Sequence, residues 1–453
     1  MIISEIKYNQ VIERLRFDAE YYQPEFLKSE SMLKKCKDVS LYEISKFSKL
    51  RRNPENEPEK ELKYIDISNV NISTGDITIQ LLKGHQAPSR ARKVVRENEI
   101  IISTVRPNRN AVAIITKELN NQICSTGFAV IKTEKINPWF LFAYLKTKYA
   151  INQLVRMTMA SMYPAVSEDD IGSILVPISP STFQQRIESY VKESYEKRKS
   201  ADEKYKSAEE LLNKTLGIEK LELKEEKIFE TKFGEIDSSL RFDAEHYKPK
   251  YTQVKEFIIK SGYEVRKLKE VVKISNKKIG PSKEPIKLFN YIELANINPS
   301  TGEIEEVSQI KGYEAPSRAR MSVKAGDVLV SSLLGSLDNI GFVPGELDSS
   351  VASTGFFVIR SDIFLPEFLF LLFRSNLMKL QLEEKTAGAI MSAVPKTTFG
   401  DLLIPVIPQE KQKPISDLIK QSFSLRKEAK ELLEKAKREI EEFIGKNGNQ
   451  NHC

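Results

Sequence analysis

The most regular pattern of apolar and polar positions lies in the middle of the chain, from Ser181 to Gly217. Apolar or small residues recur there at alternating spacings of four and three, while glutamate and lysine fill most other positions. This alternation keeps one stripe on one face of a helix, which is typical of a coiled coil. The sequence therefore predicts a helix over 181–217, about 50 Å long, that ends at Gly217 and needs a partner helix.

The pattern returns 228 residues later, so the partner helix is expected in the same chain, over 409–445. Gly445 then corresponds to Gly217, and Pro414 is expected to delay the helix by about a turn. We expect the two helices to pair antiparallel. The main members of the seam are Ile187, Val191, Ala201, Leu212, Ile415, Ile419, Ala429 and Ile440. Ser194, Arg198, Ser422 and Arg426 are polar seam positions that either fix the register or, for the arginines, pack their stems while the heads reach solvent.

Further repeats make the whole chain a tandem duplication. LRFDAEYYQP returns as LRFDAEHYKP, KYIDISNVNISTGDI as NYIELANINPSTGEI, APSRAR unchanged, and STGFAVIK as STGFFVIR, all 225 to 228 residues apart. Such a period indicates a duplicated domain rather than a solenoid repeat. Runs rich in β-branched residues predict strands in the first half at 62–68, 76–82, 99–104, 111–116, 127–132 and 173–178. Helices are expected after Pro24 and over 138–155.

The expected fold class is α/β (α+β), with two tandem globular domains separated by two long helices that form an antiparallel coiled coil. The expected segments are a first globular domain at 1–180, the central helix at 181–217, a linker at 218–235, a second globular domain at 236–408, the distal helix at 409–445 and a disordered tail at 446–453.

Composition narrows the class of protein. The chain has 453 residues, of which 40% are hydrophobic and 29% charged, as in globular proteins. The formal net charge of +7 permits a polyanionic partner without demanding one. Three scattered cysteines without a CxxC motif favour a reducing cytoplasm and argue against zinc. The N-terminus lacks an apolar signal core and the longest apolar run is too short for a bilayer, so no membrane association is expected.

No pattern of catalytic residues emerges. The sequence contains no glycine-rich phosphate loop, and its three histidines are isolated. The paired carboxylates Asp18/Glu20 and Asp243/Glu245 stand beside Arg16 and Arg241, just before helices, so an Arg–carboxylate bridge or a helix N-terminal charge explains them better than catalysis does. No catalytic residue, metal or cofactor is therefore expected.

The duplication and the entry into each long helix resemble the specificity subunits of type I restriction–modification systems. The entry motif is Pro-x-x-Pro-x-x-x-Gln-x-x-Ile, at Pro177, Pro180, Gln184 and Ile187 and again at Pro405, Pro408, Gln412 and Ile415. RFDAEYYQP and RFDAEHYKP also look like the start of a target-recognition domain of that family. The resemblance covers nearly the whole chain. It implies a non-enzymatic reader of a split duplex DNA site, on which two methyltransferase (modification) subunits dock and which motor-nuclease (restriction) subunits join.

Basic side chains are the candidates for DNA contact, because lysine and arginine neutralise phosphates and arginine also reads guanine. They are Arg51, Arg52, Lys83, Arg90, Arg92, Lys93, Arg106 and Arg109 in the first half, and Lys277, Lys278, Lys283, Arg318 and Arg320 in the second. The alternative is an ordinary solvated basic face.

Residues shared by the halves cannot distinguish two different half-sites. The identical pairs Arg90/Arg318 and Arg92/Arg320 are therefore expected to contact phosphates or to be structural. The divergent stretches are better candidates for base readout, with Arg106 and Arg109 as donors. These stretches are 104–111 against 332–340, and 157–166 against 385–394.

Two other interpretations stay open and a third is disfavoured. The chain is alternatively the specificity subunit of another restriction class with a fused methylase-nuclease partner, or a protein-only coiled-coil scaffold. A stand-alone nuclease is disfavoured, because no acidic metal-binding motif occurs. If the helices space the two halves, the DNA site should be two short sequences about one helical turn apart.

Overall fold

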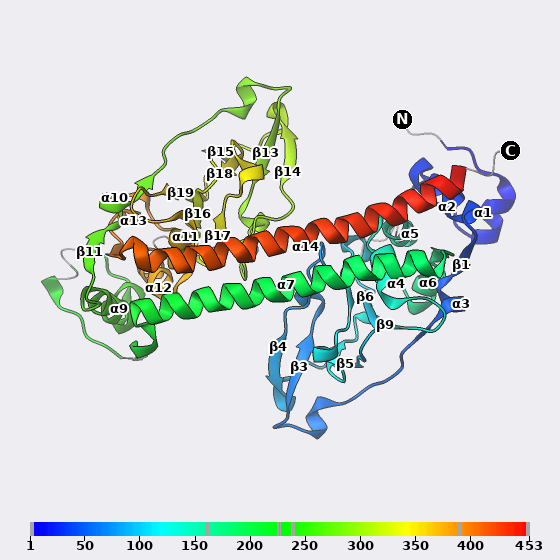
Figure 1. Cartoon of the computed structure of the whole chain (residues 1–453), viewed down its shortest axis with the longest axis horizontal. Coiled ribbons are helices and arrows are strands. Elements are labelled where there is room, and N and C mark those ends of the chain that lie inside the picture. The colour runs from blue at the N-terminus through cyan, green and yellow to red at the C-terminus, as the bar shows by residue number, and fades with distance from the viewer. Residues whose placement is uncertain are drawn as a thin grey trace. The chain divides into compact units, whose positions relative to one another are not determined.

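The computed structural model describes residues 4–158, 164–223, 226, 228–234, 236, 241–386 and 392–449. The chain forms two compact units: unit 1 is Met1–Arg198 with Arg426–Cys453, and unit 2 is Lys199–Leu425. Each unit therefore includes part of both long helices, although the sequence pattern predicts these helices as separate segments. Figure 1 labels the helices and strands.

The sheets of unit 1 contain mostly antiparallel strands. One has the order β2-β9-β6-β7, a second has the order β4-β3-β8-β5 with β3 and β8 parallel, and β1 pairs with β10. The strands are β1 Asp38–Ser40, β2 Ser45–Phe47, β3 Glu61–Ile65, β4 Gln80–Lys83, β5 Ala91–Val94, β6 Ile100–Ser103, β7 Val112–Ile114, β8 Ile123–Ser125, β9 Phe128–Thr133 and β10 Leu175–Pro177. The sequence patterns missed β1, β2, β5 and β8.

Unit 2 repeats this topology strand for strand. Its sheets have the orders β12-β19-β16-β17 and β14-β13-β18-β15, and β11 pairs with β20. The strands are β11 Glu264–Lys267, β12 Lys273–Ile274, β13 Leu288–Ile292, β14 Ser308–Lys311, β15 Ala319–Ser322, β16 Val328–Ser331, β17 Ile340–Phe342, β18 Val351–Ser353, β19 Phe356–Arg360 and β20 Leu403–Val406. The fold class is thus the expected mixture of helices and sheets, built twice.

The helices complete each unit. Unit 1 has α1 Tyr8–Arg14, α2 Pro24–Lys35, α3 Leu41–Ile44, α4 Pro138–Leu145, α5 Lys148–Met157 and α6 Glu168–Gly172, and unit 2 has α9 Pro249–Ile259, α10 Leu268–Val271, α11 Pro366–Arg374, α12 Asn376–Lys385 and α13 Lys396–Phe399. The long helices are α7 Ser181–Leu216 and α14 Gln409–Asn449. In the described residues no helix is long and apolar enough to cross a membrane.

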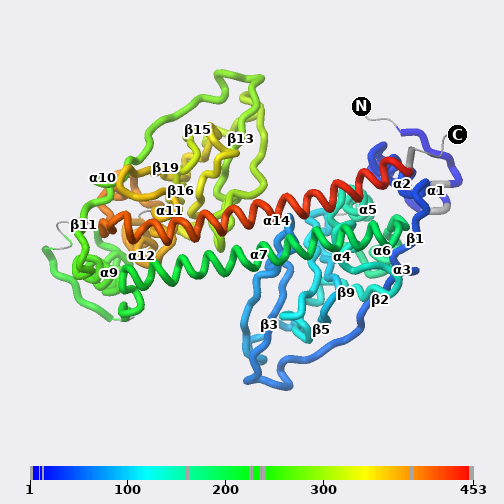
Figure 2. The backbone as a smooth tube through the Cα atoms, in the orientation of Figure 1, coloured from blue at the N-terminus to red at the C-terminus, as the bar shows by residue number. Residues whose placement is uncertain are grey.

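Strand β6 shows how the layers of unit 1 arise. Its sequence Ile-Ile-Ile-Ser is apolar at successive positions, and a strand alternates its side chains between two faces. Ile100 and Ile102 pack in the core that contains α4 and α5, whereas Ile101 packs in a second core against the other sheet. The sheet is therefore buried on both faces, with a sheet on one side and helices on the other (Figure 2).

The helix expected over 138–155 is two helices, α4 and α5. Thr147 has an extended backbone, and its amide and hydroxyl both donate to the carbonyl of Tyr144, at 2.8 and 2.7 Å. These bonds end α4 locally, and the chain turns at Lys146 into α5. The sequence pattern does not predict this break, because threonine is common inside helices and no glycine or proline marks the position.

The turn between β3 and β4 requires glycine in both units. Gly75 and Gly302 have φ of +79° and +73°, where an L side chain is strained. An added Cβ would also lie 2.7 Å from the Phe142 ring in unit 1 and 2.4 Å from the Phe370 ring in unit 2. The repeated STG sequence therefore brings each turn into contact with the aromatic helix of its unit, which is α4 in unit 1 and α11 in unit 2.

Within each unit α7 and α14 pair antiparallel through the expected seam, whose apolar members are all buried. In unit 1 Ile187 and Val191 share a core with Leu433, Ala436 and Ile440. In unit 2 Ala208 and Leu212 share a core with Ile415 and Ile419.

The seam serines fix the register of the pair. In unit 1 the hydroxyl of Ser194 donates to the carbonyl of Ala429 at 2.7 Å, and in unit 2 the hydroxyl of Ser422 donates to that of Ala201 at 2.8 Å. Arg198 does not reach solvent: it is 7% exposed, and its guanidinium donates to Asp76 at 3.0 Å.

Two expectations for the distal helix are wrong. Helix α14 begins at Gln409, with Pro414 inside it, and continues through Gly445 to Asn449. Proline removes one hydrogen bond to the carbonyl of Glu410, but both residues lie on the exposed side, where water replaces that donor. Residues 446–449, expected in a disordered tail, are helical, and 450–453 lie outside the described residues.

The glutamine of the entry motif ties each long helix to its unit. In unit 1 Gln184 Oε1 accepts the amide of Asn137, the N-cap of α4, at 3.0 Å. In unit 2 Gln412, which is fully buried, accepts the amide of Leu365 at 2.8 Å and donates to the carbonyl of Ile407 at 2.7 Å. The motif therefore anchors the beginning of each long helix to the aromatic helix of the same unit.

Candidate nucleic-acid interface

The shared basic residues lie on and before β5 in unit 1 and β15 in unit 2. The side chains of Arg92 and Arg320 make the same bond, Nε to the carbonyl of Ser89 or Ser317 at 2.9 Å. Arg92 also donates to Asn53, so its guanidinium is held against the protein. This geometry favours a positioning role for the pair.

Arg90 and Arg318 precede these strands and are both exposed. In unit 1 the exposed Arg90 donates to the half-buried Asp66 at 2.7 Å. Arg318 makes no ion pair among the described residues of unit 2. Two residues that are identical in sequence therefore differ in the charge that they present.

Lys93 is the exception among the candidate basic residues, because it is buried. Its exposed fraction is 8%, and its ammonium donates to Glu168 at 2.8 Å and to the carbonyl of Phe128 at 2.6 Å. Burial alone would raise the pKa of Glu168, but hydrogen bonds from Lys49 and Lys93 lower it overall. The alternation along β5 sends Lys93 inward and Arg92 outward, so Lys93 contributes nothing to an accessible basic face.

The segment beside each basic strand carries the next candidates. Arg51 forms an isolated bridge to Lys93, and Lys278 forms the equivalent bridge to Met321. Arg51, Lys277, Lys278 and Lys283 are exposed. Arg52 is half-buried, and its guanidinium donates to Asn121 Oδ1 at 2.8 Å. Arg52 is thus partly engaged within unit 1, a contact that the sequence did not signal.

Lys83 lies at the end of β4, at the far edge of the same sheet from β5. Its ammonium donates to Glu59 at 2.9 Å, in the long connection between β2 and β3. Gly84 holds that connection close, because an added Cβ would lie 2.3 Å from the carbonyl of Glu57, and Gly312 has the same role in unit 2. Lys83 is therefore separated from the arginines of β5 by the width of the sheet.

The divergent stretches within each unit lie side by side, which the sequence alone did not reveal. In unit 1 the amide of Arg106 donates to the carbonyl of Pro164 at 2.8 Å, and that of Val166 donates to Thr104 at 2.8 Å. In unit 2 the amide of Leu334 donates to Ser392 at 3.0 Å, and that of Val394 donates to Ser332 at 2.8 Å. Each unit thus presents the two stretches as one paired surface.

The side chains of this paired surface differ in kind between the units. Arg106, Asn108 and Arg109 are exposed in unit 1, and Arg106 takes a left-handed backbone with φ of +48°. At the same place unit 2 exposes Leu334, at 43%, and Gly335. Residues 159–163 and 387–391 of the candidate readout stretches lie outside the described residues.

The repeated RFDAE motif forms an Arg–carboxylate fork in both units, as expected. Arg16 donates two bonds to Asp18, at 2.7 and 2.8 Å, and Arg241 donates two to Asp243, at 2.6 and 2.5 Å. The fork lowers the pKa of each aspartate through the arginine's hydrogen bonds. These carboxylates therefore stay ionised and have no proton to donate in acid–base catalysis.

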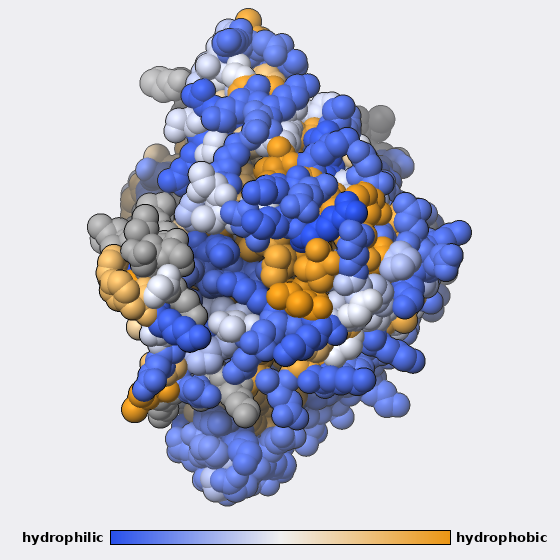
Figure 3. All heavy atoms as spheres, turned by 90° about the vertical axis from the view of Figure 1, so that its left-hand side faces the viewer, coloured by the Kyte–Doolittle hydropathy of each residue, from blue (hydrophilic) through white to orange (hydrophobic). Residues whose placement is uncertain are grey.

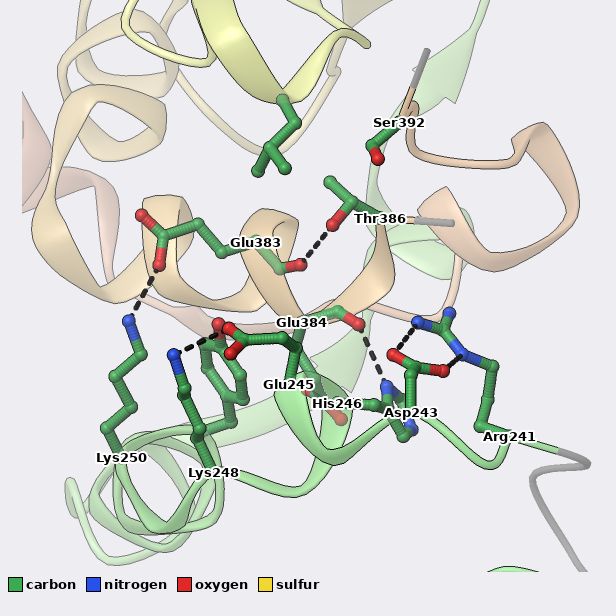
Figure 4. A pocket seen from close by; sticks show the side chains of 12 residues that line it. Arg241, Asp243, Glu245, His246, Lys248, Lys250, Glu383, Glu384, Thr386 and Ser392 are labelled. Carbon is green, nitrogen blue, oxygen red and sulfur yellow. Dashed lines mark hydrogen bonds and ion pairs between the residues drawn. The ribbon is translucent and has the colours of Figure 1, made fainter. Parts of the chain in front are cut away.

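In unit 2 the fork borders a cavity of about 600 Å³ (Figure 4). His246 contacts the carbonyl of Glu384 at 2.9 Å, and Lys250 donates to Glu383 at 3.0 Å. Leu334 and Ser392, from the paired divergent surface, complete the lining. Among the described residues no cluster of three or more histidine, cysteine, aspartate or glutamate side chains could hold a metal ion.

Residues 260–441 match the profile of the type I restriction modification DNA specificity domain. Over 119 residues the chain is 34% identical to the specificity subunit of the type I restriction enzyme HindI from Haemophilus influenzae, and this stretch is 25% of each protein. The chain thus aligns with about a quarter of that relative's length.

The chain also resembles two solved structures. The HsdS subunit from Thermoanaerobacter tengcongensis is 24% identical, with 92% of this chain and 97% of that one covered and a TM-score of 0.34. The type I restriction–modification S subunit from M. genitalium is 13% identical, with 91% and 95% covered and a TM-score of 0.45.

Proposed function

We propose that the chain is a specificity subunit of a type I restriction–modification system and that it reads a duplex DNA site in two separated halves, one with each unit. The paired divergent surface carries this proposal. Two units with the same strand order and the same basic strand carry different side chains at 106–109 and 334–338, next to the place where 104–106 meets 164–166 and 332–334 meets 392–394. A reader of two different half-sites needs this combination of a common frame and separate readout.

The basic residues divide between two roles in this proposal. Arg90, Arg92, Arg318 and Arg320, together with Arg51, Lys277, Lys278 and Lys283, position the DNA through its phosphates. Arg106 and Arg109 donate to base edges in the first half-site. Arg52 and Lys83 contribute less, because Asn121 and Glu59 already hold them.

Methylation and cleavage are assigned to partners in this proposal. Two methyltransferase subunits dock on the chain, and motor-nuclease subunits join the complex. In each unit the aspartate of the acidic pair is held by two hydrogen bonds from its arginine, which gives it a structural role. The purified chain should then neither methylate nor cut DNA by itself.

Methylation mapping tests the proposal. Genomic DNA from cells that carry this chain with its methyltransferase partner should bear methyl groups at one bipartite sequence. Exchange of both stretches of the paired surface, 104–109 and 164–166, for those of a different specificity subunit should change one half of that sequence and leave the other. Methylation that ignores the exchange, or that has no bipartite pattern, would refute the proposal.

We further propose that the paired helices set the spacing between the half-sites. Support comes from α7 and α14, each of which continues across the boundary of the units, and from the serine bonds that fix their register. A heptad inserted after Ala201 and another after Ala429 keeps the seam in phase. The spacer in the methylated site should lengthen by a few base pairs while both half-sites stay the same.

A further inference from the structure

Both units expose the same phenylalanine. Phe17 and Phe242 stand 225 residues apart in the identical sequence LRFDAE, and their exposed fractions are 73% and 84%. A phenylalanine side chain gains free energy when it is buried, so an isolated unit gains nothing from this arrangement. A single exposed apolar residue needs no explanation, but the same one repeated at the same place does.

The structure holds each phenylalanine outward. Arg16 and Asp18 flank Phe17, and the guanidinium of Arg16 donates two hydrogen bonds to Asp18. The hydroxyl of Tyr22 also donates to the carbonyl of Arg16, at 2.9 Å. Tyr247 makes the same bond to Arg241 at 2.6 Å in unit 2. With both neighbours fixed, the side chain between them is presented to solvent in a preset orientation.

The surroundings of the two loops have diverged although the loops have not. In unit 1 the guanidinium groups of Arg16 and Arg156 both contact the ring of Tyr21, 4.5 and 4.1 Å from its centroid. In unit 2 the corresponding residue is His246, which contacts the carbonyl of Glu384. The repeated phenylalanine is therefore not explained by packing against a common neighbour.

We propose that Phe17 and Phe242 are twin docking anchors for two copies of one protein partner, each of which supplies an apolar pocket. This inference rests on the proposed function, in which the partner is the methyltransferase subunit. A surface that meets the same partner twice must be the same in both units. A surface that reads two different half-sites must not be.

The local charge favours a protein over DNA. The arginine of each motif is neutralised by its fork. Glu20 adds an exposed acidic side chain in unit 1, and Glu245 adds one in unit 2 that pairs with Lys248 at 2.5 Å. Neither motif thus offers an unpaired cation to a DNA phosphate, whereas an apolar pocket of a protein gains free energy by covering the phenylalanine. A second exposed aromatic extends each anchor: Tyr8 and Phe233 occupy equivalent positions nine residues earlier and are 79% and 78% exposed.

Other exposed apolar residues provide controls, because they are not repeated. Figure 3 shows one face of the molecule, on which apolar side chains gather among mainly hydrophilic ones. Ile259 on α9 is 60% exposed, and unit 1 has Lys34 at that position. Leu81 on β4 is 65% exposed, and unit 2 has Gln309 there.

The experiment compares Phe17→Ala, Phe242→Ala and the double variant in the full-length chain, mixed with the methyltransferase subunit from the same cells. Native mass spectrometry counts the bound subunits, and titration gives their affinities. We expect two bound copies for the wild type, about 30-fold weaker binding at one of the two sites in each single variant, and loss of both in the double variant. Ile259→Lys and Leu81→Gln should retain two copies. Thermal unfolding should be unchanged in every variant.

Each other outcome overturns the inference. A double variant that still binds two subunits refutes the anchors and leaves the proposed function standing. Loss of duplex binding by the double variant without any partner assigns the phenylalanines to DNA, and conversion of a wild-type dimer to monomer assigns them to a second copy of this chain. If the wild type binds no methyltransferase, the inference and the assignment of that partner fall together, and methylation mapping decides whether the reading role survives.

Discussion

An ion pair joins equivalent helices in the two units, but the positive and the negative residue have exchanged helices. In unit 1 Arg156 on α5 donates to Glu30 on α2 at 2.6 Å, and in unit 2 Lys255 on α9 donates to Glu384 on α12 at 2.5 Å. The residues occupy matching places, the ninth of α5 and α12 and the seventh of α2 and α9. The side chains of Arg156 and Glu30 are 7% and 13% exposed in unit 1. Those of Lys255 and Glu384 are 32% and 5% exposed in unit 2, so each pair has one buried member.

The reversal shows which substitutions a buried position tolerates. Either helix of the pair can carry the positive residue, provided that the facing residue on the other helix is negative. A change at one residue leaves a buried charge without its partner, which costs far more than the pair contributes. The helices of each unit have therefore diverged as matched pairs, whereas the exposed paired surface diverges without this constraint. Readout loops can be moved between units one at a time, but these helices must be moved together.

The largest expected effect comes from breaking the pair in unit 1. Arg156→Glu places two carboxylates together and should lower the free energy of unfolding by about 3–5 kcal/mol. Glu30→Lys added to it recreates the pair of unit 2 and should recover most of that loss. Chemical denaturation of the three proteins measures both effects. A double variant no more stable than Arg156→Glu would show that the sign is not interchangeable.

A second contrast concerns Lys146, for which unit 2 has Arg374. Lys146 is 3% exposed and donates to the carbonyls of Ile72 and Asn110, at 2.9 and 3.1 Å. Burial lowers its pKa to about 7 from an ordinary value of 10.5. Above pH 7 the unfolded chain therefore holds a proton that the folded chain has released, so this lysine makes stability rise with pH.

Between pH 7 and 9 the gain from Lys146 should be about 2 kcal/mol. Lys146→Met removes the titrating group and should flatten this part of the stability curve. Arg374→Met in unit 2 should leave the slope as it is, because arginine does not titrate there. Unfolding curves at several pH values make the comparison, and equal slopes in the wild type and Lys146→Met would contradict it.

Smaller effects are expected at the paired divergent surface, where only unit 1 presents arginines. Arg106→Ala or Arg109→Ala should relax the preference at one base position of one half-site, by about 1–3 kcal/mol. Methylation sequencing should show the other half-site unchanged. A uniform loss of binding to all sequences would instead assign these arginines to phosphates.

The smallest expected effect separates the shared arginines. Replacement of Arg90 and Arg92 together by alanine should weaken binding to specific and unrelated duplexes by similar factors and reduce the salt dependence. Arg318→Ala alone should flatten that dependence more than Arg90→Ala alone, because Arg90 is already paired with Asp66. Affinities over a series of salt concentrations test this, and a base-specific change would reverse the assigned roles.

The sequence predicted the duplication, the seam and most strands, because each is a periodic pattern or a literal repeat. It failed where one residue decides the local geometry. Thr147 ends α4 through bonds to Tyr144 that no periodicity reveals. Pro414 stays inside α14 because its missing hydrogen bond faces solvent, a fact that depends on which side of the helix is packed.

Among the site residues the sequence identified the basic segments but not their orientation. Arg90, Arg92 and Lys93 look alike as a charged run, and the missed strand β5 separates them into outward and inward side chains. Asp66, which pairs with Arg90, had a signal, since an acidic residue stands there in both halves. The meeting of 104–106 with 164–166 had none, because contacts between distant segments depend on the tertiary fold.

The division of both long helices between the units has a consequence for synthesis on the ribosome. The core of unit 1 includes Leu433, Ala436, Ile440 and Ile444, which are translated more than 200 residues after Val191. Until these residues of α14 have been translated, Ile187 and Val191 have no partner helix to pack against. The core of unit 1 therefore cannot be completed before unit 2 has been translated. Contacts this distant along the chain slow folding and leave apolar surface open meanwhile. The first unit to be translated is the last to be completed.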